Sequence, residues 1–323
     1  MAGRELKALF RAFRERDELA FRRAAQTIIE EEEAKQHLAL ARDLKRVLAS
    51  GSDITVAEAV ELPAPPTDRD GEWPLAEVRA PQRHLDDLVL PPAVADQLAQ
   101  FAAEVPRWTS LDDFGIPRRQ RLLFHGPPGC GKTSAADALA NELGWPLLVV
   151  RLDAVISSYL GETASNLRRV FDYASDGAWV VLFDEFDALG KSRDDIGEHG
   201  EVKRVVNAFL QMLDAFRGRS IMIAATNHEH LLDSALWRRF DEVLSFPRPT
   251  VHQLRATLRR RLPAERRRGV DIDGAASQLR GLPHAAAEKV VWDALRAVVL
   301  DGRDTVEQGD LEDAIECARQ RPW

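Results

Sequence analysis

The sequence of 323 residues predicts an α/β fold, in which a parallel sheet is covered by helices on both faces and a small all-helical domain follows. The first observation is a series of short, nearly continuous apolar runs between residues 84 and 248, separated by helical segments. The second is that these runs stop after Pro247 and Pro249, where only helical spacing continues. The expected domains are therefore an α/β domain over 84–248 and a helical lid over 249–323. The apolar runs are Leu122–Phe124, Leu147–Val150, Trp179–Phe183, Ile221–Ala225 and Val243–Phe246.

The region before residue 84 has two parts. Residues 1–50 predict a helical hairpin or small bundle, because apolar residues such as Leu6, Phe10 and Phe13 recur at helical spacing. About fifty residues can build only a thin core, so this N-terminal domain is expected to dock on something else. Residues 51–83 predict a linker, since prolines interrupt every periodic pattern there.

Composition narrows the class of protein. A net charge of −8 and a pI near 5.6 argue against nucleic acid as the main partner. Two runs of arginines, Arg259–Arg261 and Arg266–Arg268, leave room for a local basic patch, but they are interpreted as an ordinary solvated helix end. Two cysteines, Cys130 and Cys317, are too few for a disulfide framework. No apolar run approaches the roughly 18 residues of a membrane span, and the N-terminus lacks the apolar stretch of a signal peptide, so we expect a cytoplasmic protein.

One glycine-rich segment carries the strongest chemical signal. Residues 126–133, Gly-Pro-Pro-Gly-Cys-Gly-Lys-Thr, fit the phosphate-binding P-loop pattern and lie between an apolar strand and a helix. Glycines allow backbone N–H groups to converge on phosphate oxygens at the helix N-terminus. Lys132 is expected to reach the terminal phosphates and Thr133 to ligate Mg²⁺. The nucleotide-binding candidates here are Gly126, Pro127, Pro128, Gly129, Cys130, Gly131, Lys132, Thr133 and Ser134.

An acidic pair ends the apolar run Trp179–Phe183. Asp184 and Glu185 follow this run directly, about fifty residues after the P-loop. Because ligands bind at the carboxyl ends of strands in open α/β sheets, both carboxylates are expected beside the P-loop. We predict that Asp184 holds Mg²⁺ and that Glu185 polarises the attacking water, so that ATP and Mg²⁺ are the expected ligands.

The order of these motifs resembles the AAA ATPases in the strict sense, especially the single-ring branch that contains katanin and spastin. The similarity extends from about Asp86 to Asp313. The resemblance implies that Asn227, at the end of an apolar strand, is the sensor-1 residue that helps to place the water. It also implies that Arg238 and Arg239 are arginine fingers that reach a neighbouring subunit's site. The family usually separates these arginines by Pro-Gly, so one of them could act alone, and Arg239 is favoured.

Further positions follow from the same resemblance. Tyr159, Leu160 and Gly161 resemble the first pore loop, in which an aromatic residue grips an extended polypeptide. A second pore loop is expected near 191–201. Val89 and His284 occupy places that border the adenine in relatives. The element Leu-Asp-Ala-Phe at 213–216 has alanine where the family's intersubunit signalling element has glycine.

The leading functional hypothesis is an ATP-hydrolysing ring, expected to be hexameric, that threads, unfolds or remodels a protein substrate. An alternative is a nucleotide-dependent assembly switch that regulates a partner, such as a separate protease. Alanine and arginine are abundant, as in many bacterial proteins, and some short bacterial AAA ATPases of this layout accompany a subtilisin-like protease. A DNA-acting loader is the least favoured alternative, because the chain is acidic and the expected pore loop is aromatic rather than basic.

Overall fold

The computed structural model describes residues 25, 27–29, 64–71, 73–156, 160–189, 199–228 and 237–323. Contacts divide the chain into two units, Met1–Glu61 and Leu62–Trp323. In the first unit, residues 25 and 27–29 are helical, and the rest of the expected N-terminal helical domain lies outside the described residues. All other elements belong to the second unit.

The second unit contains a six-stranded sheet with the strand order β1-β3-β4-β5-β2-β6. Five strands are parallel, and β1 pairs antiparallel with β3 at one edge. The strands are β1 (Ala76–Arg79), β2 (Arg121–His125), β3 (Leu147–Val150), β4 (Val180–Phe183), β5 (Ile221–Thr226) and β6 (Glu242–Ser245). The five apolar runs predicted from the sequence therefore correspond to the five parallel strands.

Strand β1 corrects the linker that the sequence analysis extends to residue 83. Pro74 and Pro81 flank this strand but do not lie within it, so all four of its residues can pair with β3. Leu75 and Ala76 are buried in the core beneath the sheet. The segment just before residue 84 is thus part of the α/β domain, where it forms an edge strand.

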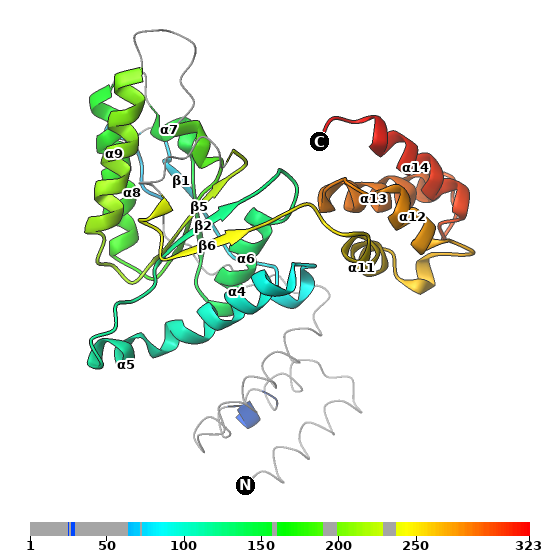
Figure 1. The fold of residues 1–323 in the computed structure, drawn as a ribbon, viewed down its shortest axis with the longest axis horizontal. Helices are drawn as coiled ribbons and strands as arrows, with labels where there is room; N and C mark the ends of the chain where they lie inside the picture. The colour runs from blue at the N-terminus through cyan, green and yellow to red at the C-terminus, as the bar shows by residue number, and fades with distance from the viewer. Residues whose placement is uncertain are drawn as a thin grey trace. The chain divides into compact units, whose positions relative to one another are not determined.

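Helices cover both faces of the sheet, as Figure 1 shows for α8 and α9 against α4 and α6. Side chains alternate between the faces along β4: Val181 and Phe183 join the core with α8 and α9, whereas Val180 and Leu182 join the core with α4 and α6. The helices of this domain are α4 (Pro92–Glu104), α5 (Trp108–Asp113), α6 (Lys132–Leu143), α7 (Leu152–Val155), α8 (Leu160–Ser175) and α9 (His199–Ala215).

The lid is helical, as predicted. Thr250 begins it with a capping box, in which its hydroxyl accepts from the Gln253 amide. Its core gathers residues such as Leu254, Val290 and Leu311 from three helices. The lid helices are α11 (Val251–Arg261), α12 (Ile272–Gln278), α13 (His284–Leu300) and α14 (Gln308–Gln320). Short 3-10 turns lie at η1 (Leu85–Asp87), η2 (Val105–Arg107), η3 (Phe186–Leu189) and η5 (Ala264–Arg266). Among the described residues, none of the helices combines the length and apolar character that crossing a membrane demands.

Candidate functional site

The P-loop, residues 126–133, connects the end of β2 to the start of α6, as its pattern predicts. Three of its glycines have positive φ: 133° at Gly126, 69° at Gly129 and 100° at Gly131. This backbone is strained for residues with a side chain. Gly126 is also needed for space, because a Cβ there would lie 2.3 Å from the backbone oxygen of Phe246.

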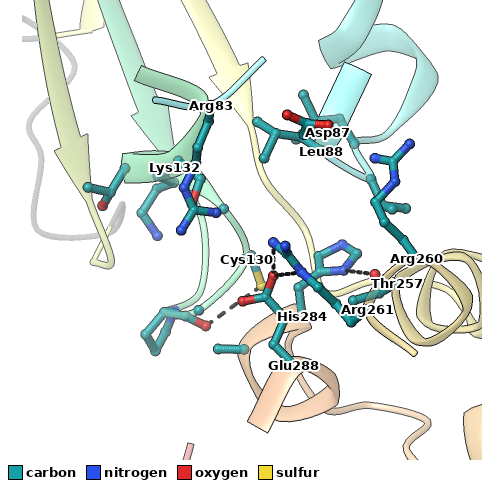
Figure 2. A pocket seen from close by; sticks show the side chains of 18 of the residues that line it. Arg83, Asp87, Leu88, Cys130, Lys132, Thr257, Arg260, Arg261, His284 and Glu288 are labelled. Atoms are coloured by element: carbon teal, nitrogen blue, oxygen red, sulfur yellow. Dashed lines mark hydrogen bonds and ion pairs between the residues drawn. The ribbon is translucent and has the colours of Figure 1, made fainter. Parts of the chain in front are cut away.

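The P-loop lines a cavity of about 320 Å³. Figure 2 shows side chains that approach this cavity from several elements. The predicted site residues that line it are Val89, Pro128, Gly129, Cys130, Gly131, Lys132, Thr133, Ser134, Asp184, Glu185, Asn227 and His284. Gly126 and Pro127, which were also predicted, are not part of the lining. The structure therefore brings the phosphate loop, the acidic strand end and the strand-terminal asparagine to one cavity.

Lys132 is almost completely buried and donates three hydrogen bonds. Its Nζ lies 2.6 Å from the Gly126 oxygen, 3.0 Å from the Pro127 oxygen and 2.7 Å from Asn227 Oδ1. Burial lowers the pKa of Lys132, and the carboxylates of Asp184 and Asp187 oppose this shift. Three acceptors match the three protons of an ammonium group, so this arrangement holds the charged form.

Thr133 and Asp184 form a second contact at the same end of the cavity. The Thr133 hydroxyl donates to Asp184 Oδ2 over 2.6 Å, and the Glu185 amide donates to Asp184 Oδ1 over 2.9 Å. A hydroxyl and a carboxylate are the hard oxygen ligands that Mg²⁺ prefers, and Mg²⁺ commonly takes only one or two protein ligands beside phosphates and waters. This pair fits the group that the sequence analysis expects.

Glu185 has an unusual backbone. Its φ is 51°, and it is the single non-glycine residue with positive φ in the described part of the chain. An L-residue in this left-handed region is strained by about 1–2 kcal/mol. The side chain is exposed at the cavity. Strain of this kind at a polar residue is characteristic of functional sites.

Asp187 holds the end of β5 at Asn227 through hydrogen bonds, a role that the sequence analysis did not predict. Its carboxylate is buried and accepts from the Thr226 hydroxyl at 3.1 Å and from the Asn227 amide at 3.4 Å. His228 Nε2 lies 3.9 Å from the same carboxylate. The signal was present in the sequence, because Asp187 belongs to the Asp-Glu-Phe-Asp box that supplies Asp184 and Glu185.

The lid closes another side of the cavity. The Ala285 amide, at the start of α13, donates to the Gly129 oxygen over 3.1 Å and so joins the lid to the P-loop. Arg261 donates to Glu288 at 2.6 Å, and His284 Nδ1 lies 2.9 Å from the Thr257 hydroxyl. Burial lowers the pKa of His284, and the Glu288 carboxylate opposes this shift.

The arginine run was misinterpreted at one point. Arg259 and Arg260 are exposed, as expected, but Arg260 and Arg261 also line the cavity, so the run is not only a solvated helix end. Thr257, Glu288 and Arg83 also line the cavity and were not predicted. Cys130 is buried in the loop, and this burial raises the pKa of its thiol.

The predicted arginine fingers are not part of this cavity. Arg238 is exposed, and Arg239 pairs with Asp214, with 2.9 Å between Nη1 and Oδ2. Tyr159 and most of 191–201 lie outside the described residues, so the two expected pore loops have no structural account. Leu160 and Gly161 are the first residues of α8.

Known proteins resemble this chain, one of them along almost its whole length. Residues 122–248 match the family described as "ATPase family associated with various cellular activities (AAA)". The chain is 39% identical to the "Uncharacterized AAA family ATPase y4kL" of Sinorhizobium fredii, over 99% of this chain and 97% of that protein. It is 31% identical over 74% of its length to the "ATP-dependent zinc metalloprotease FtsH 3" of Sphaerobacter thermophilus. It is 32% identical over 64% of its length to the "Proteasome-activating nucleotidase" of Pyrococcus horikoshii. The matches span 50% and 53% of these last two relatives.

Proposed function

This chain belongs to the AAA family of ATPases and hydrolyses ATP, and from this premise we propose that it works as a ring that unfolds or remodels protein substrates. The ring is expected to be hexameric, with the substrate threaded through its centre. The alternative of a DNA-acting loader has no support in the acidic charge of the chain.

The observation that carries the proposal is the convergence of Lys132, Glu185 and Asn227 on one cavity, because this set of residues supports the ATP hydrolysis that would drive the ring. Lys132 would place its charge on the terminal phosphates. The contact of 2.7 Å between Lys132 Nζ and Asn227 Oδ1 supports a role for Asn227, as a sensor residue, at the same phosphates. Glu185, exposed at the cavity, would accept a hydrogen bond from the attacking water and orient it.

Thr133 and Asp184 would hold Mg²⁺ beside the nucleotide. The bound ion would supply positive charge that neutralises phosphate oxygens. The Thr133 hydroxyl oxygen and Asp184 Oδ2 lie 2.6 Å apart, which supports a shared metal site for the two side chains. The backbone N–H groups of the P-loop provide further electropositive groups without any charged side chain.

A neighbouring subunit would complete the site. Neither Arg238 nor Arg239 lines the cavity of its own chain, although a finger arginine is typically worth about 10³–10⁵ in rate. Supplied by the next subunit, this arginine would make hydrolysis depend on assembly. We therefore propose that the ring is the active species.

Two relatives support a protein substrate. One is named as an ATP-dependent metalloprotease and another as a proteasome-activating nucleotidase, and both match about half their length to this chain. We propose that Tyr159 grips the substrate in the pore, next to Leu160 and Gly161. The N-terminal domain, residues 1–50, would select the substrate.

ATPase activity per subunit, measured against protein concentration, tests the ring. Glu185→Gln serves as the blank, because it keeps the size of the side chain but removes the carboxylate. A rate per subunit that rises with concentration and saturates supports the ring. Should the rate stay flat, mixing in Arg238→Ala or Arg239→Ala subunits decides between a preassembled ring, which they would inhibit, and a self-sufficient subunit, which they would not.

Unfolding of a substrate tests the threading step. A candidate substrate protein fused to a fluorescent domain would lose fluorescence in the presence of ATP. Tyr159→Ala should abolish this loss while leaving basal ATP hydrolysis measurable. Unfolding that persists at full rate in Tyr159→Ala would contradict threading by this residue.

The Arg239–Asp214 pair favours a second candidate function, an assembly switch that regulates a partner. An arginine bound within its own subunit is not available to a neighbour until that pair breaks. In this alternative, partner binding would release the arginine, and ATP turnover would act as a timer. Partner-dependent ATPase activity without unfolding of the partner would support the switch.

A further inference from the structure

The cavity has two sides, one at Lys132 and the other where side chains of the lid and of the segment 87–90 lie. Figure 2 shows Lys132 on one side of the hollow, with Leu88, His284 and Thr257 on the other. Leu88, Val89 and Leu90 line the cavity at this second side. The charged side chains of Asp87, Arg260, Arg261 and Glu288 also line this second side. Because Lys132 is the expected phosphate contact, the side with Leu88, Val89 and Leu90 is the place for a purine base.

The position of His284 follows from the backbone. His284 is the first residue of α13, and the next residue, Ala285, donates its amide to the Gly129 oxygen over 3.1 Å. The histidine is thereby held next to the P-loop at the rim of the cavity. Its ring is only partly buried.

Hydrogen-bond accounting determines the tautomer of His284. The Thr257 hydroxyl has one proton, and it lies 3.0 Å from the Gln253 carbonyl oxygen, which can only accept. That proton is therefore used within α11. His284 Nδ1, 2.9 Å from the same hydroxyl, must carry a proton and donate it to Thr257 Oγ1.

The other ring nitrogen is then left with a lone pair. In neutral imidazole, a protonated Nδ1 means that Nε2 is an acceptor. Within the described part of the chain, Nε2 has no hydrogen-bond partner. Burial favours the neutral ring by lowering the pKa of His284. The side chain thus presents a single acceptor at the base side of the cavity.

We propose that His284 selects the base of the nucleotide: its Nε2 accepts a hydrogen bond from the exocyclic 6-amino group of adenine. Guanine carries a carbonyl oxygen at that position, so two acceptors would face each other. Thr257 acts as a positioning residue that fixes the tautomer. This inference rests on the proposed nucleotide site and adds to it a residue that distinguishes adenine from guanine.

Binding of three triphosphates tests the proposal in the full chain carrying Glu185→Gln, which prevents turnover. The probes are ATP, GTP and purine riboside triphosphate, which resembles ATP without the 6-amino group. One neutral hydrogen bond corresponds to a roughly three- to tenfold preference for ATP over purine riboside triphosphate. The preference over GTP should be larger, about tenfold or more, because an unpaired acceptor faces His284.

Two substitutions separate recognition from packing. His284→Ala should lower the affinity for ATP to that for purine riboside triphosphate. The affinity for purine riboside triphosphate should stay within about twofold of its original value. Thr257→Val keeps the shape but removes the acceptor for Nδ1, and it should reduce the ATP preference. Thr257→Ser keeps a hydroxyl and should retain the preference, which controls for changes in folding.

The binding results distinguish a failure of the His284 proposal from a failure of the proposed function. Equal binding of ATP and purine riboside triphosphate to the parent would overturn the assignment of His284, while leaving the nucleotide site itself intact. An equal loss of both ligands in His284→Ala would also overturn it, because the ring would then only fill space. Failure of all three triphosphates to bind the parent would instead overturn the proposed function.

Discussion

Arg239 forms an ion pair with Asp214 inside its own subunit, with 2.9 Å between Nη1 and Oδ2. Asp214 lies in the last turn of α9. Arg121 approaches the same carboxylate at 3.6 Å, and its Nη1 donates to the Arg239 carbonyl over 3.5 Å. The pair therefore holds Arg239, a proposed arginine finger, on its own subunit, and Arg239 can reach a neighbouring subunit only when the pair breaks.

Asp214→Asn should make assembly-dependent hydrolysis easier. The pair is partly exposed, so breaking it costs about 0.2–1 kcal/mol. Release of Arg239 should lower the protein concentration at half-maximal ATPase activity by up to about fivefold. The measurement is the rate per subunit across a dilution series.

The two arginines provide the control for this effect. Asp214→Asn should still shift the curve in an Arg238→Ala background, where Arg239 remains. No shift should occur in an Arg239→Ala background, where the pair is already absent. A shift of equal size in both backgrounds would show that Asp214 acts on something other than Arg239.

Glu185→Gly should stabilise the protein relative to Glu185→Ala. Both changes remove the carboxylate and should abolish hydrolysis, but only glycine relieves the backbone φ of 51°. Relief of about 1–2 kcal/mol, offset partly by the greater freedom of glycine in the unfolded chain, leaves about 1 kcal/mol. Chemical denaturation without nucleotide measures this difference. Equal unfolding free energies would mean that the loop relaxes around any side chain.

Gly126→Ala should destabilise the protein more than Gly131→Ala does. Both glycines have positive φ, so both substitutions strain the backbone. A Cβ at Gly126 would meet the Phe246 backbone oxygen at 2.3 Å, whereas a Cβ at Gly131 would meet only Leu90, at 4.0 Å. The backbone clash should add about 1–3 kcal/mol. Unfolding free energies measured without nucleotide would refute this account if the order were reversed.

The fold could be predicted largely because its parallel strands are short apolar runs, two of which, β4 and β5, are fully buried. All six residues of β5 are buried, so this strand appears in the sequence as a continuous apolar run, the pattern of a parallel strand that is covered on both faces. Strand β1 escaped prediction because it has four residues between prolines and alternating burial, which resembles a linker. Its pairing with β3 is a tertiary contact that no local pattern contains.

The site residues likewise include some that local sequence predicted and others that depend on tertiary packing. Lys132 and Asp184 belong to contiguous motifs, so local sequence placed them at the cavity. Arg261 and Glu288 are 27 residues apart and come together only because α11 packs beside α13. Their position at the cavity depends on how the lid meets the P-loop. That docking depends on contacts such as Ala285–Gly129, for which the sequence carries no signal.

His284 should give the protein a pH-dependent stability at mildly acidic pH. Burial lowers its pKa from an ordinary value of 6.5, and Glu288 only partly opposes this. Between the two pKa values, His284 is therefore protonated in the unfolded chain but mostly neutral in the folded chain. The stabilisation is complete above the unfolded pKa and is lost as the pH falls through the folded pKa. His284→Gln keeps a polar side chain that cannot titrate, so its melting temperature should fall less between pH 7 and pH 5. Because the other histidines titrate in both proteins, the difference between the two curves isolates His284. Parallel curves would show that His284 has the same pKa in the folded and unfolded chain.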